Sequence, residues 1–216
     1  MKYQLLVFDW DGTIIDSIEL ILRSYRHTME HHRANEPAPP DDMWIAGLGT
    51  PLWAQFGQIT EDKEEIERMV QTYRKYNLTH HDALVKPYEG VVEEIRRMKT
   101  AGKRLGVVTS KLRDGAMRGL RVSGLDDVFD LVIGCDDVKN SKPHPEPVLK
   151  AVAELVAKAS ETVFVGDSRH DMESGRAARV KTAAVLWGPF DRAHLEDLEP
   201  DYWLEKPGDL RQLYQP

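Results

Sequence analysis

Short apolar runs recur along the chain and alternate, in its second half, with amphipathic stretches of helical length. Each run has the length and composition of a buried parallel strand. The runs occupy residues 5–8, 105–108, 131–133, 163–165 and 183–186, and a further short strand is expected at 202–204. The amphipathic stretches occupy residues 91–101, 113–122 and 147–157. This alternation predicts an α/β fold, with a parallel sheet covered by helices on its faces.

The alternation is missing from residues 17–86, where the pattern is helical and contains no convincing strand. The apolar residues that recur there at helical spacing include Ile66, Met69, Val70 and Tyr73. The residues that separate the first helix of this segment from the next are Pro37, Pro39 and Pro40. A Pro-Tyr-Glu-Gly turn at 87–90 then returns the chain to the α/β pattern. We therefore predict a core of residues 1–16 and 87–216 with an inserted helical domain at 17–86.

Composition and charge narrow the range of partners. With 216 residues, of which 41% are hydrophobic and 30% charged, the chain can bury a substantial core. The net charge of −7 and the isoelectric point near 5.6 argue against broad binding to nucleic acids or anionic membranes, because both need a concentrated positive face. No signal-like or membrane-spanning apolar stretch occurs, so we expect a cytoplasmic protein. A monomer or homodimer is expected. Cys135 is the single cysteine, and we expect a small buried residue there.

The sequence Asp9-Trp10-Asp11-Gly12-Thr13 directly follows the first apolar run. Two carboxylates at the end of a buried strand repel each other unless a cation offsets their charge. Magnesium, which prefers oxygen ligands, is the natural ion for so small an acidic cluster. Taken alone, the motif is equally compatible with a polar turn, since Asp-Gly is common in turns. Trp10 lies between the aspartates, and strand alternation predicts that its side chain points away from them.

Chemically active side chains follow other apolar runs as well. Thr109, Ser110 and Lys111 follow the second run, Asp167 and Asp171 follow the fourth, and Lys142 stands at the start of a predicted helix. In open parallel sheets, the groups at the carboxyl ends of the strands gather in one place. Together these groups suit phosphoryl transfer, which needs a nucleophile, a proton donor and positive charge.

Each of these residues also has a plainer interpretation when taken alone. Thr109 or Ser110 could cap the following helix, and Asp171 could be a surface cap. Lys142 could be solvated, as most lysines are. Their joint occurrence at successive strand ends favours a catalytic site.

In these positions the whole chain resembles the haloacid dehalogenase superfamily of phosphohydrolases. The four motifs of that family occur in order, and they are Asp9-Trp10-Asp11-Gly12-Thr13, Thr109, Lys142, and Gly166-Asp167 with Asp171. The resemblance implies a Rossmann-like parallel sheet as the core fold. It also implies that the helical insertion is the family's cap domain of the helical kind.

The resemblance implies roles for the residues that match these motifs. Asp9 would attack phosphorus and form an aspartyl-phosphate, and Asp11 would protonate the leaving group and then deprotonate water. Asp9, the backbone carbonyl of Asp11 and Asp167 would bind Mg²⁺, with Asp171 holding a metal-bound water.

The second and third motifs would serve the substrate, a small phosphorylated compound. Thr109 and the backbone amide of Ser110 would bind phosphate oxygens, and Lys142 would neutralise charge on Asp9 and on the transferring group. Dehalogenases of this fold lack the second acidic residue, so Asp11 favours phosphate substrates. A sugar-phosphate mutase could use the same two aspartates, whereas a non-catalytic binding module would be expected to have lost a charged position, and none is lost here.

The cap segment bears on the substrate and leaves two alternatives open. The loop at 47–52, with Gly49 and Thr50, resembles that of phosphoglycolate phosphatases, whereas residues 73–85 are more similar to inorganic pyrophosphatases of the same branch. Either substrate needs a cation on the cap, and Arg74 is the first candidate, with His80 and His81 behind it. For the two histidines, a solvated helix end is the favoured interpretation. The aromatic residues expected in the core of the cap rather than against substrate are Trp44, Trp53 and Phe56.

Overall fold

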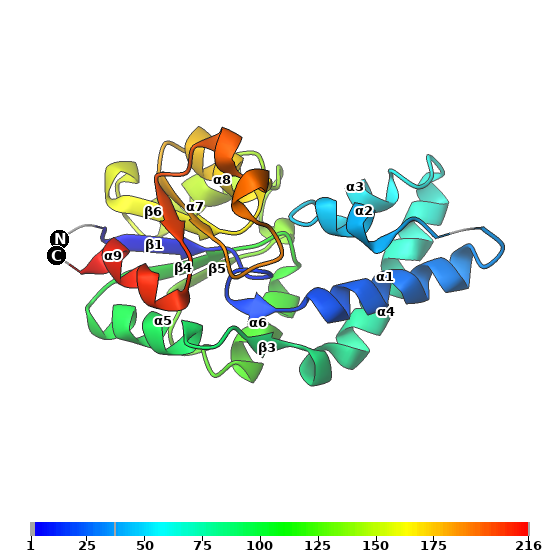
Figure 1. Cartoon of the computed structure of the whole chain (residues 1–216), viewed down its shortest axis with the longest axis horizontal. Helices are drawn as coiled ribbons and strands as arrows, with labels where there is room; N and C mark the ends of the chain where they lie inside the picture. Colours follow the sequence, from blue (N-terminus) through cyan, green and yellow to red (C-terminus); the bar gives the residue numbers. More distant parts are fainter. Residues whose placement is uncertain (1–2, 37, 216) are drawn as a thin grey trace.

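The computed structural model describes residues 3–36 and 38–215, and its centre is a six-stranded parallel sheet in the order β5-β4-β1-β6-β7-β8 (Figure 1). The strands are β1 (Leu5–Phe8), β4 (Arg104–Val108), β5 (Leu131–Ile133), β6 (Thr162–Gly166), β7 (Lys181–Val185) and β8 (Tyr202–Leu204). All six expected strands are present, and their ends differ from the predicted ones by at most two residues. The α/β fold with a parallel sheet is therefore confirmed.

Strand β1 lies inside the sheet, between β4 and β6. Leu6 pairs with Leu105 on one side and with Val163 on the other, so both edges of β1 are hydrogen-bonded. Its side chains alternate, with Leu6 and Phe8 in one apolar cluster and Leu5 in the other. The residues that follow Phe8 are thereby held at the carboxyl edge of the sheet by two neighbouring strands.

Helices cover both faces of the sheet. Val91, Ala116 and Leu213 from α5, α6 and α9 join one cluster, whereas Val148 from α7 joins the other. Met172 of α8 packs with Ala184 of β7. The bounds of these helices are α5 (Val91–Thr100), α6 (Arg113–Val122), α7 (Glu146–Glu154), α8 (Arg169–Ala177) and α9 (Arg211–Tyr214). Helix α7 ends three residues before its predicted limit of 157, because the chain turns at Val156, whose φ is +47°.

Between β1 and α5 the chain forms four helices, which lie beyond one end of the sheet (Figure 1). These helices are α1 (Ile18–His32), α2 (Asp41–Ala46), α3 (Leu52–Phe56) and α4 (Lys63–Leu84). Strands β2 (Ile15–Asp16) and β3 (Lys86–Pro87) pair antiparallel at their base, although no strand was expected in this part of the chain. Two-residue strands are too short to leave an alternating pattern. Pro37, one of the predicted helix breakers, lies outside the described residues.

An aromatic cluster holds the four helices together. The Trp44 ring stacks on Tyr25 with centroids 4.3 Å apart and contacts Phe56 at 4.8 Å, and Tyr73 of α4 packs against both Trp44 and Phe56. The prediction that Trp44 and Phe56 form the core of this segment is confirmed. The same prediction is wrong for Trp53, which is 66% exposed. In helix α3, Phe56 points inward and Trp53, one turn earlier, does not.

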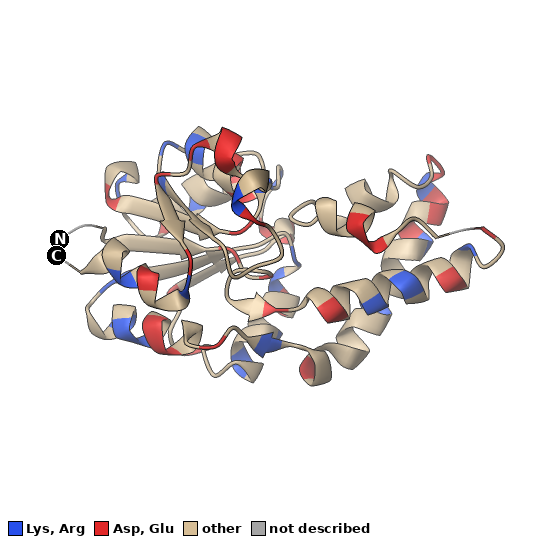
Figure 2. Cartoon of the chain, in the orientation of Figure 1, with Lys and Arg blue, Asp and Glu red and all other residues tan. Residues whose placement is uncertain are grey.

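Two further properties concern the surface. Across the described residues, no helix is both long enough and apolar enough to span a membrane. Figure 2 shows acidic and basic positions interspersed along the helices. The acidic positions in the cartoon are therefore spread over many elements rather than gathered in one segment.

Candidate active site

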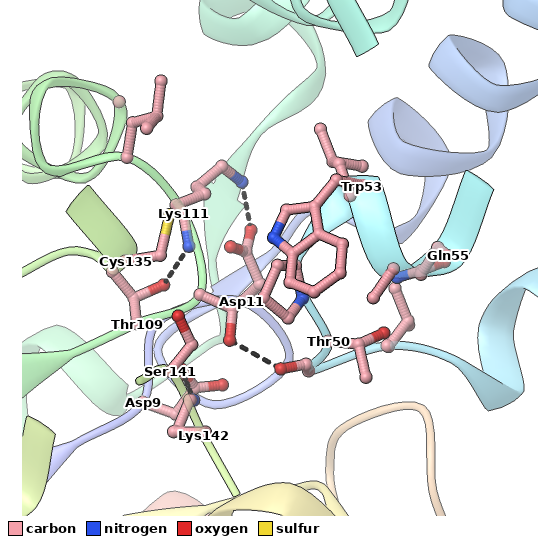
Figure 3. A pocket seen from close by; sticks show the side chains of 18 of the residues that line it. Asp9, Asp11, Thr50, Trp53, Gln55, Thr109, Lys111, Cys135, Ser141 and Lys142 are labelled. Atoms are coloured by element: carbon pink, nitrogen blue, oxygen red, sulfur yellow. Dashed lines mark hydrogen bonds and ion pairs between the residues drawn. The ribbon is translucent and has the colours of Figure 1, made fainter. Parts of the chain in front are cut away.

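The residues after β1, β4 and β6, together with the segment before α7, line one cavity of about 1220 Å³ that lies between the sheet and helices α1 to α4 (Figure 3). The predicted site residues that line it are Asp9, Asp11, Gly49, Thr50, Arg74, Thr109, Ser110, Lys142 and Asp167. The structure thus brings together residues that are up to 158 positions apart in the sequence, counting from Asp9 to Asp167. Asp171 lies directly beneath them, hydrogen-bonded to Lys142.

Lys142 is at the centre of the buried polar network. Its Nζ donates to Asp9 Oδ1 at 2.7 Å and to Asp171 Oδ1 at 2.6 Å, and the side chain is almost fully buried. Burial alone would lower the pKa of the ammonium, but Asp171 and Asp9 together raise it above its ordinary value. The alternative of a solvated lysine is therefore wrong, and Lys142 carries a permanent positive charge at the floor of the cavity.

Three buried carboxylates surround that charge. Asp9, Asp167 and Asp171 each present an oxygen, and these oxygens lie within 4.8 Å of one another. Burial, and then repulsion from Asp171, raises the pKa of Asp9 and of Asp167 despite the presence of Lys142. One ammonium thus offsets only part of the negative charge. An oxygen-only cluster that is short of positive charge suits a hard divalent cation such as Mg²⁺.

Local hydrogen bonds fix the two carboxylates that follow β6. Thr13 Oγ1 donates to Asp167 Oδ1 at 2.9 Å. Asp171 Oδ2 accepts from the Ser168 amide at 3.0 Å and from the Ser168 hydroxyl at 2.6 Å, in a capping box that begins α8. Asp171 therefore does cap a helix, but it is fully buried rather than on the surface. Both of its oxygens are engaged by protein groups.

Asp11 does not join the network around Lys142 and has partners of its own. Its Oδ1 accepts from Ser17 Oγ at 2.5 Å and forms an ion pair with Lys111 Nζ (Figure 3). Trp10, between the two aspartates, turns away as predicted and packs against Gly119 of α6. Sequence reasoning gave no role to Lys111 or Ser17. The place of Lys111 at the end of a strand was the available signal, since that edge collects functional groups.

Thr109 and Ser110 follow β4 at the same edge. Thr109 Oγ1 accepts from the Lys111 amide at 3.2 Å, and Ser110 Oγ donates to the carbonyl of Gly49 at 2.5 Å. Neither residue caps α6, whose N-cap position is Leu112. The alternative of a helix cap is therefore wrong for both. Ser110 instead links the loop after β4 to the loop between α2 and α3.

The loop between α2 and α3 closes one side of the cavity. Gly49 has a φ of +94°, and a Cβ at this position would lie 2.9 Å from Ser168 Oγ and 3.1 Å from His170 Nδ1. The next residue, Thr50, hydrogen-bonds through its hydroxyl to the carbonyl of Gly47. Glycine at position 49 thus allows the loop to lie directly against the residues that follow β6.

With this geometry established, comparison with known proteins identifies the family. The family model described as haloacid dehalogenase-like hydrolase matches residues 6–185. The chain belongs to this family. The match spans all four motifs, so the predicted family is confirmed.

Two curated relatives of this hydrolase are named pyrophosphatase PpaX. The protein from Anoxybacillus flavithermus is 44% identical over 213 residues, which cover 99% of this chain and 97% of the relative. The protein from Halalkalibacterium halodurans is 43% identical over the same shares of both chains. These relatives, together with the family, confirm the predicted enzyme class, a hydrolase of the phosphatase type.

Solved structures share the fold of the hydrolase over nearly its whole length. A haloacid dehalogenase-like hydrolase from Bacteroides fragilis has a TM-score of 0.90 at 29% identity and covers 97% of this chain and 100% of its own. A structure described as a predicted phosphoglycolate phosphatase from Haemophilus somnus has a TM-score of 0.89 at 21% identity, with 100% and 99% covered. At that identity the second likeness concerns the fold alone.

The remaining predictions for the hydrolase concern residues around the cavity. Arg74 is half-buried and lines it, and none of the ion pairs found in the described chain includes it. His81 is 1% exposed and hydrogen-bonded to Asp82, so its assignment to a solvated helix end is wrong, whereas His80 is half-buried against Tyr76. On the earlier turns of α4, Tyr73 and Asn77 point inward at a spacing of four residues, and His81 continues the same face.

Cys135 also differs from its prediction. It is half-buried and lines the cavity rather than lying fully inside the core, and burial raises the pKa of its thiol. The apolar run before it ends at Ile133, one residue before the chain leaves the sheet edge. Cys135 therefore stands at the carboxyl edge of the sheet, where residues face the cavity.

Proposed function

We propose that this chain is a magnesium-dependent phosphohydrolase that cleaves inorganic pyrophosphate through an aspartyl-phosphate at Asp9. The observation that carries the proposal is the carboxylate of Asp9, buried at the cavity floor and held by the Lys142 ammonium at 2.7 Å. The substrate is supported by the two pyrophosphatase relatives, which match this chain over nearly its full length. A cytoplasmic location and a monomeric or homodimeric state stay predictions.

The donor set fits the cation that this chemistry requires. We propose that Asp9 and Asp167, with the backbone carbonyl of Asp11, bind Mg²⁺. Asp171 stays outside the ligand set, since Lys142 and Ser168 occupy both of its carboxylate oxygens. When bound, Mg²⁺ would offset the charge of the carboxylates and of the phosphate oxygens. It would also lower the raised pKa of Asp9, which favours the ionised and nucleophilic form.

The protein side chains then stabilise charge, bind the phosphate oxygens and transfer the proton. Lys142 orients Asp9 and supplies positive charge to the group in transfer. Thr109 and the amide of Ser110 receive the phosphate oxygens, because they follow β4, the strand that pairs with β1 directly before Asp9. Asp11 protonates the departing phosphate and later takes a proton from the attacking water. The hydrogen bond from Ser17 holds the Asp11 carboxyl in place for both steps.

Pyrophosphate brings a second anionic group that must also be neutralised. Besides Lys142, the lysine and arginine side chains that line the cavity are Arg74, Lys111 and Lys139. We propose that Arg74, which has no carboxylate partner of its own among the described residues, binds the second phosphate in a bidentate manner. Gly49 and Thr50, on the loop that closes the cavity, complete the substrate site.

Phosphate release with Mg²⁺ tests this function, with pyrophosphate and 2-phosphoglycolate compared side by side. We expect a higher kcat/KM for pyrophosphate, and the reverse preference would make a carboxylate the group that the cap recognises. Asp9→Asn should lower kcat by at least about 10³-fold with the fold intact, as removal of a nucleophile does. Asp126→Asn, an exposed carboxylate elsewhere, serves as the control. Retained magnesium-dependent turnover in Asp9→Asn would exclude the mechanism.

The role of Arg74 needs a separate comparison. Arg74→Ala should raise KM for pyrophosphate more than for p-nitrophenyl phosphate, because the second compound carries only one phosphate. Equal effects on both substrates would remove Arg74 from the substrate site.

A further inference from the structure

The cavity above Asp9 is larger and less polar than pyrophosphate requires. Its volume of about 1220 Å³ exceeds the usual range for ligand pockets, roughly 300–1,000 Å³. The side that belongs to the sheet is polar, whereas the side formed by helices α1 to α4 and their loops carries many apolar side chains. These are Ile18, Ile21, Trp44, Leu48, Leu52, Trp53 and Leu78. Pyrophosphate has no apolar atom, so it leaves this wall in contact with water.

Trp53 is the most exposed residue of that wall. Its side chain is 66% exposed, although Trp44 and Phe56 nearby are buried. None of the aromatic pairs within the described chain includes Trp53. Figure 3 shows its indole reaching from α3 toward the side of the cavity where Asp11 and Lys111 lie. A large aromatic face thus stands open inside the same cavity as the proposed nucleophile.

An open indole beside a phosphate site suits a ligand with a planar ring. Stacking of a nucleobase on an aromatic side chain is favourable and tolerant of the base, since every base has a π-face. Asn140 and Ser141 line the same cavity from the segment before α7, and both can hydrogen-bond a sugar hydroxyl. One cavity therefore holds a group for each part of a nucleotide: Asp9 for the phosphate, Asn140 and Ser141 for the sugar, and Trp53 for the base.

We propose that the chain also hydrolyses nucleoside monophosphates, with the phosphate at Asp9 and the base stacked on Trp53. This activity rests on the proposed function for its phosphoryl-transfer centre and extends it to a second substrate class. An Asp9 carboxylate oxygen forms a bond to phosphorus as the bond between phosphorus and the 5′ oxygen of the nucleoside breaks. The departing 5′ oxygen takes the proton of Asp11. Water then attacks phosphorus, returns a proton to Asp11 and releases orthophosphate and Asp9.

The test isolates the base by comparing adenosine 5′-monophosphate with ribose 5-phosphate, which lacks it. With Mg²⁺, the wild-type chain should hydrolyse adenosine 5′-monophosphate with a kcat/KM about tenfold higher than that for ribose 5-phosphate, as expected for one stacked base. Trp53→Ala should remove this difference. The same variant should lower kcat/KM for adenosine 5′-monophosphate about tenfold more than for pyrophosphate.

Two further variants keep the test specific. Trp53→Phe retains a ring and should keep most of the preference for the nucleotide. Leu149→Ala removes a side chain on α7 that is 46% exposed and does not line the cavity, so it should leave all three substrates unchanged. An equal loss for all three substrates in Trp53→Ala would overturn the stacking role.

The remaining outcomes separate this inference from the proposed function. Hydrolysis of pyrophosphate, with no preference for the nucleotide over ribose 5-phosphate, would overturn the inference alone. Hydrolysis of the nucleotide that depends on Trp53, without hydrolysis of pyrophosphate, would support the inference and overturn the proposed pyrophosphatase.

Discussion

Arg118 and Asp82 form a bidentate ion pair between α6 and α4, with Nε to Oδ1 at 2.8 Å and Nη2 to Oδ2 at 3.0 Å. Arg118 Nη1 also donates to the carbonyl of Leu78 at 2.7 Å. These bonds join the last turns of α4 to a helix that packs on the sheet. The planar fork of the guanidinium can serve all three acceptors at once. The end of α4 is therefore tied to the sheet layer immediately before the chain re-enters it.

Loss of this ion pair should loosen α4 locally and change global stability little. Arg118→Ala should lower Tm by less than about 4 °C, because partly exposed ion pairs contribute at most about 1 kcal/mol. Hydrogen exchange of the amides at 78–84 should become faster. Arg121→Ala, an exposed residue of the same helix with no ion pair among the described residues, is the control. Unchanged exchange in Arg118→Ala would contradict the proposed tie.

The loop that closes the cavity should not tolerate a side chain at position 49. Gly49→Ala combines a positive φ with a Cβ only 2.9 Å from Ser168 Oγ, so the loop must shift. A shift of about 1 Å beside a reacting group can cost up to 10²-fold, and we expect kcat/KM for pyrophosphate to fall between about 10- and 100-fold.

Gly102→Ala is the matched control, since its φ of +76° imposes a similar strain while nothing lies within 4 Å of the added Cβ. It should lower stability without affecting turnover. Similar turnover in both variants would show that the crowding at position 49 is unimportant.

The interactions of Glu94 should make the folding stability of the chain sensitive to acid. Burial alone would raise the pKa of this carboxyl, but Arg211, Tyr214 and Arg97 hydrogen-bond to it and bring the pKa below its ordinary value. Because the folded pKa lies below the unfolded one, about 4.3, the stabilisation is present above that pH. It is lost as the pH falls through the folded value.

Urea unfolding from pH 7 to pH 3 checks this expectation. Glu94→Gln should reduce the free energy of unfolding at pH 7 by about 1–3 kcal/mol and flatten its decline in acid. Glu89→Gln, at an exposed position without an ion pair among the described residues, should follow the wild type. Parallel pH profiles for Glu94→Gln and the wild type would contradict the assignment.

Magnesium should stabilise the fold independently of any substrate. At a concentration 100 times the dissociation constant, a ligand of the native state adds about 2.7 kcal/mol, which corresponds to roughly 5–10 °C in Tm for a chain of this size. Asp167→Asn should abolish most of this increase, whereas Asp126→Asn should retain it. An identical shift of Tm with magnesium in Asp167→Asn would exclude Asp167 as a ligand.

The sequence was sufficient to predict the strands of the large sheet and the residues that gather at its carboxyl edge. Apolar runs located every strand of the large sheet, and the residues after β1, β4 and β6 gather at one edge of it. Asp9, Thr109 and Asp167 meet for this reason, and Lys142 joins them from the segment before α7, although the pattern along the chain carries no distances. The roles assigned to them stay predictions.

Side chains on the four helices were harder to predict, because helical spacing does not say which of two apolar faces is inward. Trp53 and Phe56 are three residues apart, yet only Phe56 is buried. Lys111 and Ser17 were missed because their importance comes from one partner, Asp11, and not from a pattern of their own. His81 was misjudged because its burial follows from its place on the inward face of α4, with Tyr73 and Asn77, and not from its position near the end of the helix.

The antiparallel pair of β2 and β3 makes the segment of helices α1 to α4 a separable module of the chain. Ile15 pairs with Pro87 and Asp16 with Lys86, so the chain leaves the α/β layer and returns to it at one point. Among the described residues between these two ends, none pairs with a strand of the large sheet. Insertions, deletions or wholesale exchange of α1 to α4 can therefore accumulate during evolution without a change of strand register. New specificity can arise above an inherited reaction centre.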